Sequence, residues 1–312
     1  MAPLMKQRHL VSEKDYTRQD LEEIFALARA VKQDPARYRG ALQGKSLAML
    51  FQKPSTRTRV SFEVGMYQLG GTALHLSAND IQLNRGETVA DTARVLSRFV
   101  DGIMARVFLQ EDLVELAKHA TVPVINGLSE MLHPCQALAD YFTLMERRGR
   151  LEGLKLAYVG DGNNVCHSLM MVGGKLGVAV VAATPEGYRP NPLIVRSCAR
   201  EAQKSKAPAP QVVSDPMEAV RGADVVYTDV WTSMGQEEEA EQRRQAFQGY
   251  MVSARMMAAA AKDAVFMHCL PAHRGEEVAA EVMDGPQSVV FDEAENRLHT
   301  EKAVLMLLMG GA

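Results

Sequence analysis

Short apolar runs alternate with helical patterns along most of the chain, and this alternation is the feature that most limits the fold. Runs with strand character occupy residues 46–51, 72–76, 102–107, 121–125, 154–159, 178–183, 224–230, 264–270 and 288–291. Most are almost continuously apolar, which is typical of strands covered on both faces of a parallel sheet. The pattern therefore predicts an α/β fold.

Helical periodicity fills the gaps between these runs. We expect an opening helix over residues 19–32, capped by Thr17 and Asp20, and a long helix from Pro134 to residue 148. The glycines and polar residues that follow mark a boundary. A chain of 312 residues is long enough for two domains. We expect two similar-sized domains, each a parallel β-sheet flanked by helices: residues 1–148, residues 149–291, and a C-terminal helix (292–312) that packs back on the first domain.

Composition excludes several classes of protein. The 35 basic and 38 acidic residues give a net charge of −3, which argues against a nucleic-acid partner. No stretch approaches the ~18 apolar residues of a membrane span, and the charged first residues leave no room for a signal peptide. The four cysteines have no paired spacing, which indicates a reducing compartment. We expect a soluble cytoplasmic protein with no membrane partner.

Polar residues follow the predicted strands of the first domain at their carboxyl ends, where ligands bind in open α/β sheets. Residues 55–58 (Ser-Thr-Arg-Thr) come after the first strand, Arg106 lies at the end of the third, and His133 follows the fourth. A helix N-terminus with hydroxyl groups and the planar fork of Arg57 suits a phosphate. A plain helix cap is the more common explanation of an isolated Ser-x-x-Thr, but the neighbouring cations favour an anion site.

The second domain presents amides and an acid at its strand ends. Residues 160–164 (Gly-Asp-Gly-Asn-Asn) follow one predicted strand, Asp229 lies at the end of another, and residues 268–271 (His-Cys-Leu-Pro) end a third. The glycines resemble a dinucleotide fingerprint, but Val165 stands where its third glycine belongs. Asn163 and Asn164 offer the donors and acceptors that hold an amino acid, and they also suit a simple helix cap.

Four segments together resemble the ornithine carbamoyltransferases of the aspartate/ornithine transcarbamoylase family. They are residues 51–63 (Phe-Gln-Lys-Pro-Ser-Thr-Arg-Thr-Arg-Val-Ser-Phe-Glu), 133–140 (His-Pro-Cys-Gln-Ala-Leu-Ala-Asp), 229–235 (Asp-Val-Trp-Thr-Ser-Met-Gly) and 268–271. The first two are shared by all transcarbamoylases, and the last two point to ornithine as the acceptor. The resemblance runs from about residue 9 to Arg297.

This resemblance implies transfer of the carbamoyl group of carbamoyl phosphate to L-ornithine, giving L-citrulline and phosphate, with no cofactor and no metal. The residues that it assigns to carbamoyl phosphate are Ser55, Thr56, Arg57, Thr58, Gln82, Arg106, His133, Gln136, Cys269, Leu270 and Arg297. Among these, Gln82 is expected to reach the phosphate from a neighbouring subunit, because the family is built on trimers.

The resemblance assigns ornithine to Asn164, Asp229, Ser233 and Met234, and it makes Arg106, His133, Asp229 and Cys269 the catalytic residues. It also implies a cis peptide bond between Leu270 and Pro271. The direction of the reaction, assembly beyond a trimer, substrate order, effectors and the role of Cys269 stay open.

Three other interpretations remain at this point. A transcarbamoylase could act on N-acetylornithine, putrescine or aspartate, although Asp229 does not suit a dicarboxylate. The Gly160–Asn164 turn could belong to an NAD(P)-dependent oxidoreductase. A catalytically silent binding protein could keep the same scaffold.

Overall fold

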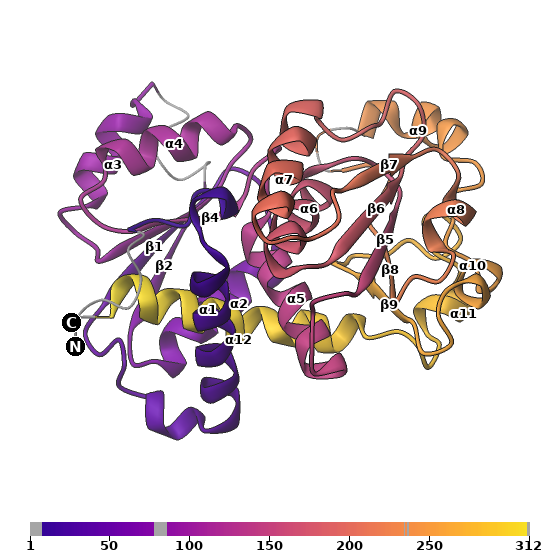
Figure 1. Ribbon diagram of the computed structural model, residues 1–312. Coiled ribbons are helices and arrows are strands. Elements are labelled where there is room, and N and C mark those ends of the chain that lie inside the picture. The colour runs from indigo at the N-terminus through magenta and orange to yellow at the C-terminus, as the bar shows by residue number, and fades with distance from the viewer. Residues whose placement is uncertain (1–7, 78–85, 234, 236, 311–312) are drawn as a thin grey trace. The chain divides into compact units, whose positions relative to one another are not determined.

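The computed structural model describes residues 8–77, 86–233, 235 and 237–310. The chain divides into two compact units: Met1–Ala139 with Glu295–Ala312, and Asp140–Ala294. The division falls within two helices, α5 (Pro134–Arg148) and α12 (Val290–Met309). Each unit holds one parallel sheet flanked by helices, so the predicted fold class is confirmed (Figure 1).

The first unit contains a four-stranded sheet in the order β2-β1-β3-β4. The strands are β1 (Ser46–Phe51), β2 (Thr72–Ser77), β3 (Gly102–Arg106) and β4 (Val124–Leu128). The helices are α1 (Arg18–Gln33), α2 (Thr56–Gln68), α3 (Val89–Leu96) and α4 (Gln110–His119), with 3-10 turns at Glu13–Asp15 and Pro35–Tyr38. Helices α3 and α4 cover one face of the sheet, and α1 and α2 lie on the other (Figure 1).

Burial along β1 shows why both faces of this sheet need cover. Ala48 and Leu50 pack in one apolar cluster with Leu113 of α4. Leu47 and Met49, which point to the opposite face, are completely buried as well. The continuous apolar run in the sequence therefore reflects burial on both sides.

The second unit contains a five-stranded sheet in the order β7-β6-β5-β8-β9. The strands are β5 (Lys155–Val159), β6 (Ala179–Ala183), β7 (Gln211–Val213), β8 (Val225–Thr228) and β9 (Val265–His268). The helices are α6 (Asn164–Leu176), α7 (Pro192–Lys204), α8 (Pro216–Val220), α9 (Ala240–Ala246), α10 (Ala254–Ala259) and α11 (Ala280–Met283), with a 3-10 turn at Glu237–Glu239. Helices α6 and α7 lie on one face of this sheet, and α8 and α10 on the other (Figure 1).

Both sheets change winding direction beside their first strand. In the first unit the chain passes from β1 to β2 on one side and returns to β3 on the other, and in the second unit β5 is flanked by β6 and β8 in the same way. Ligands of open α/β sheets bind beside such switch points, at the carboxyl ends of the strands. Phe51 pairs with Arg106, and Val159 pairs with Thr228. The segments that follow β1 and β5 therefore begin next to Arg106 and Asp229.

The structure confirms one local prediction of secondary structure and contradicts another. The capping box of Thr17 and Asp20 is confirmed at the start of α1. The strand expected at residues 288–291 is wrong: Ser288 makes only an isolated bridge to Phe266, and α12 begins at Val290. So short an apolar run does not distinguish a strand from a helix start. The sequence pattern also missed β7, a three-residue strand at the edge of its sheet.

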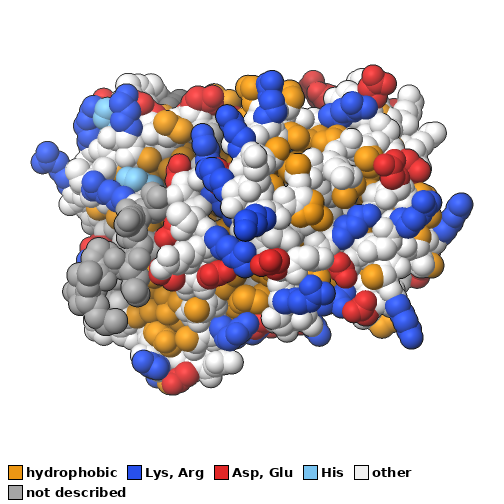
Figure 2. Space-filling view, in the orientation of Figure 1, with side chains coloured by type: hydrophobic (Ala, Val, Ile, Leu, Met, Phe, Trp, Pro, Cys, Tyr) orange, Lys and Arg blue, Asp and Glu red, His pale blue; other side chains and the backbone are white. Residues whose placement is uncertain are grey.

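The charge distribution on the surface and the hydropathy of the helices relate to the prediction of no nucleic-acid and no membrane partner. On the face drawn in Figure 2, Lys and Arg side chains lie among acidic and apolar ones, which agrees with the near balance of charge in the sequence. Among the helices that the structure describes, none is both long enough and apolar enough to cross a bilayer.

Candidate active site

The N-terminus of α2, directly after β1, is the first functional feature. Ser55 is its N-cap residue, and Ser55 Oγ accepts a hydrogen bond from the Thr58 backbone N–H at 3.3 Å. Thr56, Arg57 and Thr58 form the first helical turn. Backbone N–H groups at the start of a helix point outward along its axis, and together with the positive end of the dipole they favour an anion. Arg57 adds a guanidinium group, which matches the geometry of phosphate oxygens.

Arg106 is the last residue of β3, His133 follows β4, and both side chains are buried. Burial holds the pKa of His133 well below its ordinary value, and the positive charges of Arg297, Arg106 and Arg57 lower it further. His133 is therefore a neutral imidazole at physiological pH. It can donate a hydrogen bond to a developing oxyanion without adding a further positive charge to the cluster.

Arg297 joins this group from α12. Its Nη1 donates to Gln136 Oε1 at 2.9 Å, and its Nη2 donates to Thr58 Oγ1 at 3.2 Å. Glu301, one turn further along α12, accepts from Arg297 Nε at 2.9 Å and Nη2 at 2.6 Å. All four side chains are buried. The structure thus brings together Thr58, Gln136 and Arg297, three of the residues predicted for one ligand.

In the second unit, Asn163 connects the turn after β5 to the end of β8. Its Oδ1 caps α6 by accepting from the backbone N–H groups of Val165 and Cys166, and its Nδ2 donates to Asp229 Oδ2 at 2.7 Å. The neighbouring Asn164, which the family resemblance assigns to ornithine, is the first residue of α6, and its Oδ1 accepts from the Val165 N–H. The amide of Asn163 thus links the helix cap to the carboxylate of Asp229.

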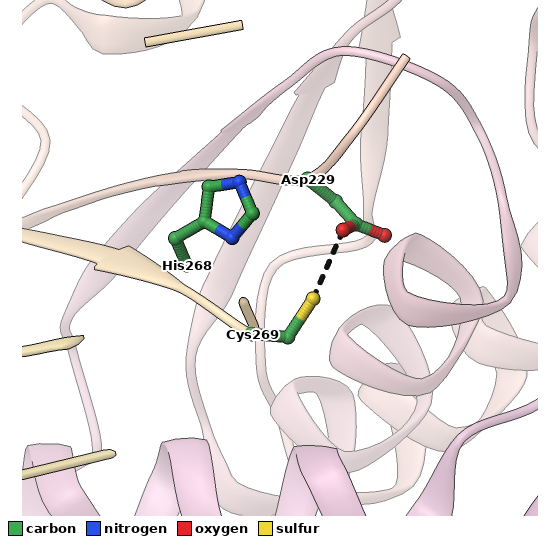
Figure 3. A group of neighbouring side chains, drawn as sticks. All are labelled: Asp229, His268 and Cys269. Atoms are coloured by element: carbon green, nitrogen blue, oxygen red, sulfur yellow. Dashed lines mark hydrogen bonds between the residues drawn. The ribbon is translucent and has the colours of Figure 1, made fainter. Parts of the chain in front are cut away.

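Cys269 lies beside Asp229 because β8 and β9 are paired, with Thr228 opposite His268. The Cys269 thiol donates to Asp229 Oδ1 at 2.9 Å, and Figure 3 shows the sulfur pointing at the carboxylate. Burial raises the pKa of the Cys269 thiol well above its ordinary value, and the charge of Asp229 raises it further. At neutral pH the sulfur is therefore a protonated donor, not a thiolate nucleophile.

His268 supports the segment that carries Cys269. Its Nδ1 accepts from the Leu270 N–H at 2.9 Å, so the proton of the neutral ring is on Nε2, which lies 3.1 Å from Glu277 Oε1. Leu270 has a φ of 60°, and the Leu270–Pro271 bond is cis, as the resemblance implies.

Asp229, His268 and Cys269 offer possible metal-ligand atoms within 4.8 Å of one another. Each of these three side chains already has a hydrogen-bond partner. A metal ion would have to displace the thiol proton and the Leu270 N–H.

A buried ion pair that the sequence did not indicate connects the turn after β5 to the segment after β8. Arg243 Nη1 donates to Asp161 Oδ2 and to the Trp231 carbonyl oxygen, both at 2.9 Å. Burial raises the pKa of Asp161 to about 6, although Arg243 acts in the opposite direction. The partners are 82 positions apart, so no local spacing could reveal them. The Arg297–Glu301 pair was also missed, although its i,i+4 spacing on a helix is a usable signal.

Packing accounts for the glycines of the 160–164 turn. A Cβ added to Gly162 would lie 2.2 Å from the backbone nitrogen of Pro190, which only glycine avoids, and Gly160 has a φ of 143°. The Gly-x-Gly pattern therefore has a structural cause that requires no dinucleotide.

The other predicted residues are placed as follows. Ser233 lies four positions after Asp229, and Leu270 directly follows Cys269. Gln82 and Met234 lie outside the described residues.

Comparison with known proteins gave consistent matches over nearly the whole chain. The family model described as "Aspartate/ornithine carbamoyltransferase, carbamoyl-P binding domain" matches residues 8–146, and the companion "Asp/Orn binding domain" matches residues 152–308. An ornithine carbamoyltransferase from Symbiobacterium thermophilum is 60% identical over 310 residues, covering 98% of this chain and 99% of its own. One from Pyrococcus furiosus, named anabolic, is 57% identical over 306 residues, with 97% of each chain covered. The solved structure of the Pyrococcus furiosus protein matches with a TM-score of 0.94 at 57% identity, with 98% of each chain covered.

We predict that replacing Asp229 with Asn makes Cys269 more reactive. The amide keeps the shape of the carboxylate but removes the negative charge that raises the thiol pKa, and the thiolate fraction grows about tenfold for each unit by which that pKa falls. Iodoacetamide labelling at pH 8, followed by mass spectrometry, measures the rate at Cys269. The buried Cys135, Cys166 and Cys198 serve as internal controls. An unchanged rate at Cys269 would contradict the coupling.

Proposed function

Since the chain belongs to the aspartate/ornithine carbamoyltransferase family, we propose that it transfers the carbamoyl group of carbamoyl phosphate to the side-chain amine of L-ornithine, giving L-citrulline and phosphate. The observation that carries this proposal is the buried cluster in the first unit, where Arg297, Thr58 and Gln136 are joined by hydrogen bonds at the N-terminus of α2. The name of the Pyrococcus furiosus relative supports a place in amino-acid biosynthesis, towards arginine. Four free cysteines support a reducing, cytoplasmic location.

In the first unit we assign the phosphate group to the turn at residues 55–58. Arg106 and His133 polarise the carbamoyl carbonyl and stabilise the oxyanion of the tetrahedral intermediate, which is the electrostatic effect that usually contributes most to the rate. Gln136 and Arg297 hold the carbamoyl amide. The domain that binds carbamoyl phosphate spans residues 1–148 in this assignment.

The second domain, residues 149–291, binds the acceptor. Asp229 attracts the side-chain amine, and Asn164, Ser233 and Met234 hold the rest of ornithine. Both oxygens of Asp229 already accept hydrogen bonds, from Asn163 and from the thiol of Cys269, which fixes the direction of the carboxylate. The thiol proton of Cys269 is donated to Asp229, and its sulfur orients the amine by accepting one of the amine's protons in a hydrogen bond.

The chemistry requires a neutral amine. With an intrinsic pKa of ~10.4, by analogy with lysine, deprotonation at pH 7 costs about 4–5 kcal/mol. The amine nitrogen then forms a bond to the carbamoyl carbon, and the bond from that carbon to the phosphate oxygen breaks. The ammonium group first releases one proton to solvent. The nitrogen loses a second proton on forming the new bond, and the departing phosphate gains one, so the reaction needs no oxidant and no covalent enzyme intermediate.

An acceptor panel tests this function. Incubation of the protein with carbamoyl phosphate and ornithine, N-acetylornithine, putrescine or aspartate, followed by measurement of ureido product, should give turnover with ornithine far above the other three. Arg106→Ala should reduce that turnover about 10²-fold or more, because it removes an oxyanion donor. Preference for another acceptor, or no product with any, would refute the proposal, and tight binding of NAD(P)H would favour an oxidoreductase.

We further infer from the family resemblance that the protein forms homotrimers with shared active sites, in which Gln82 of one subunit reaches the phosphate bound by its neighbour.

Mixing two inactive variants tests this arrangement. Trimers of Gln82→Ala and of Arg106→Ala, once their subunits are exchanged, should regenerate some complete sites and recover part of the activity. Mixtures in which subunit exchange is verified and activity stays at the level of the separate variants would exclude sharing through Gln82.

A further inference from the structure

Glu301 is a buried carboxylate in the unit that carries the carbamoyl-phosphate residues. It lies on α12, and its exposed fraction is 1%, against 3% for Arg297. Its Oε1 accepts from both Nε and Nη2 of Arg297, at 2.9 and 2.6 Å. Burial raises the pKa of Glu301, while the Arg297 charge lowers it. The pair is thus a close, desolvated contact between a carboxylate and a guanidinium group.

This contact fixes the direction of the guanidinium plane. With Nε and Nη2 bonded to Glu301, Nη1 is directed to Gln136 Oε1, and Nη2 also reaches Thr58 Oγ1. A planar fork bonded on two of its nitrogens to one oxygen cannot rotate without losing both bonds. Arg297 is therefore held towards the amide of Gln136.

The charge of Glu301 matters because, without it, Arg297 is free to pair with a bound phosphate. Arg57, Arg106 and Arg297 all lie close enough to His133 to lower its pKa. A phosphate dianion bound at the start of α2 attracts each of these guanidinium groups, and a carboxylate that already pairs with Arg297 opposes that attraction.

We propose that Glu301 is a positioning residue that holds Arg297 for the carbamoyl group and keeps it from pairing with the phosphate. This inference rests on the proposed function, and it adds a residue that the family resemblance did not indicate.

The variant Glu301→Gln tests the role of the charge. It keeps the shape and one acceptor oxygen but frees Arg297 to turn towards an anion. We expect kcat for citrulline formation to fall about tenfold, and inorganic phosphate to bind about three- to tenfold more tightly in calorimetry without ornithine. Lys302→Met, which removes a buried charge at the next position of α12 where Lys302 Nζ donates to Gln68, should leave kcat and phosphate affinity unchanged.

The variant Glu301→Asp separates charge from geometry and remains informative if Glu301→Gln fails to fold. It keeps the charge but withdraws the carboxylate by about one bond length, so kcat should fall while phosphate affinity stays near that of the unmodified protein. Loss of thermal stability alone, with unchanged kcat and phosphate affinity in either variant, would overturn the proposal.

A double-mutant cycle with Arg297→Ala shows whether Glu301 acts through Arg297. We expect Glu301→Gln to have no further effect on kcat in that background, because the group that it positions is gone. Additive losses would refute the proposal. Phosphate binding is measured without an acceptor, so it tests the inference even if ornithine is not the substrate, whereas absence of citrulline with the unmodified protein refutes the proposed function alone.

Discussion

The rest of the first unit's site depends on the mutual repulsion of guanidinium groups that are buried near the N-terminus of α2. Arg106 and Arg297 are buried there beside a helix end that already favours anions. Two features offset this concentration of charge: His133 stays neutral, and Glu301 pairs with Arg297. These two features reduce the repulsion among the cations and leave the cluster with positive charge that can attract a dianion.

The second unit has the opposite polarity. Asp229 is a buried carboxylate that accepts from Asn163 and from the protonated thiol of Cys269. Neutral donors satisfy its oxygens without cancelling its charge, so it can still attract a cationic amine. One unit is thus suited to an anionic donor substrate and the other to a cationic acceptor. The net charge of −3 for the whole chain reveals neither the positive site of the first unit nor the negative site of the second.

The sequence predicted the part of the site that follows from strand ends. Because parallel strands end at one edge of a sheet, the polar residues after β1 and β3 had to lie near one another, and Phe51 indeed pairs with Arg106. Contacts between distant segments could not be predicted from the sequence: Asp161 and Arg243 are 82 positions apart and have no shared periodicity. The hydrogen bond from Asn163 to Asp229 depends on the exact geometry of a helix cap, which composition does not encode.

The electrostatic account can be tested most directly at His133. In protein labelled with ¹⁵N-histidine, and with the signal assigned by a His133→Asn variant, the ring should remain neutral throughout a pH titration from about 8 to about 5.5, because its folded-state pKa lies well below the ordinary ~6.5. Addition of phosphate, by offsetting the cations, should raise that pKa. A His133 that titrates near ~6.5 or above in the free protein would contradict the claim that buried cations define this site.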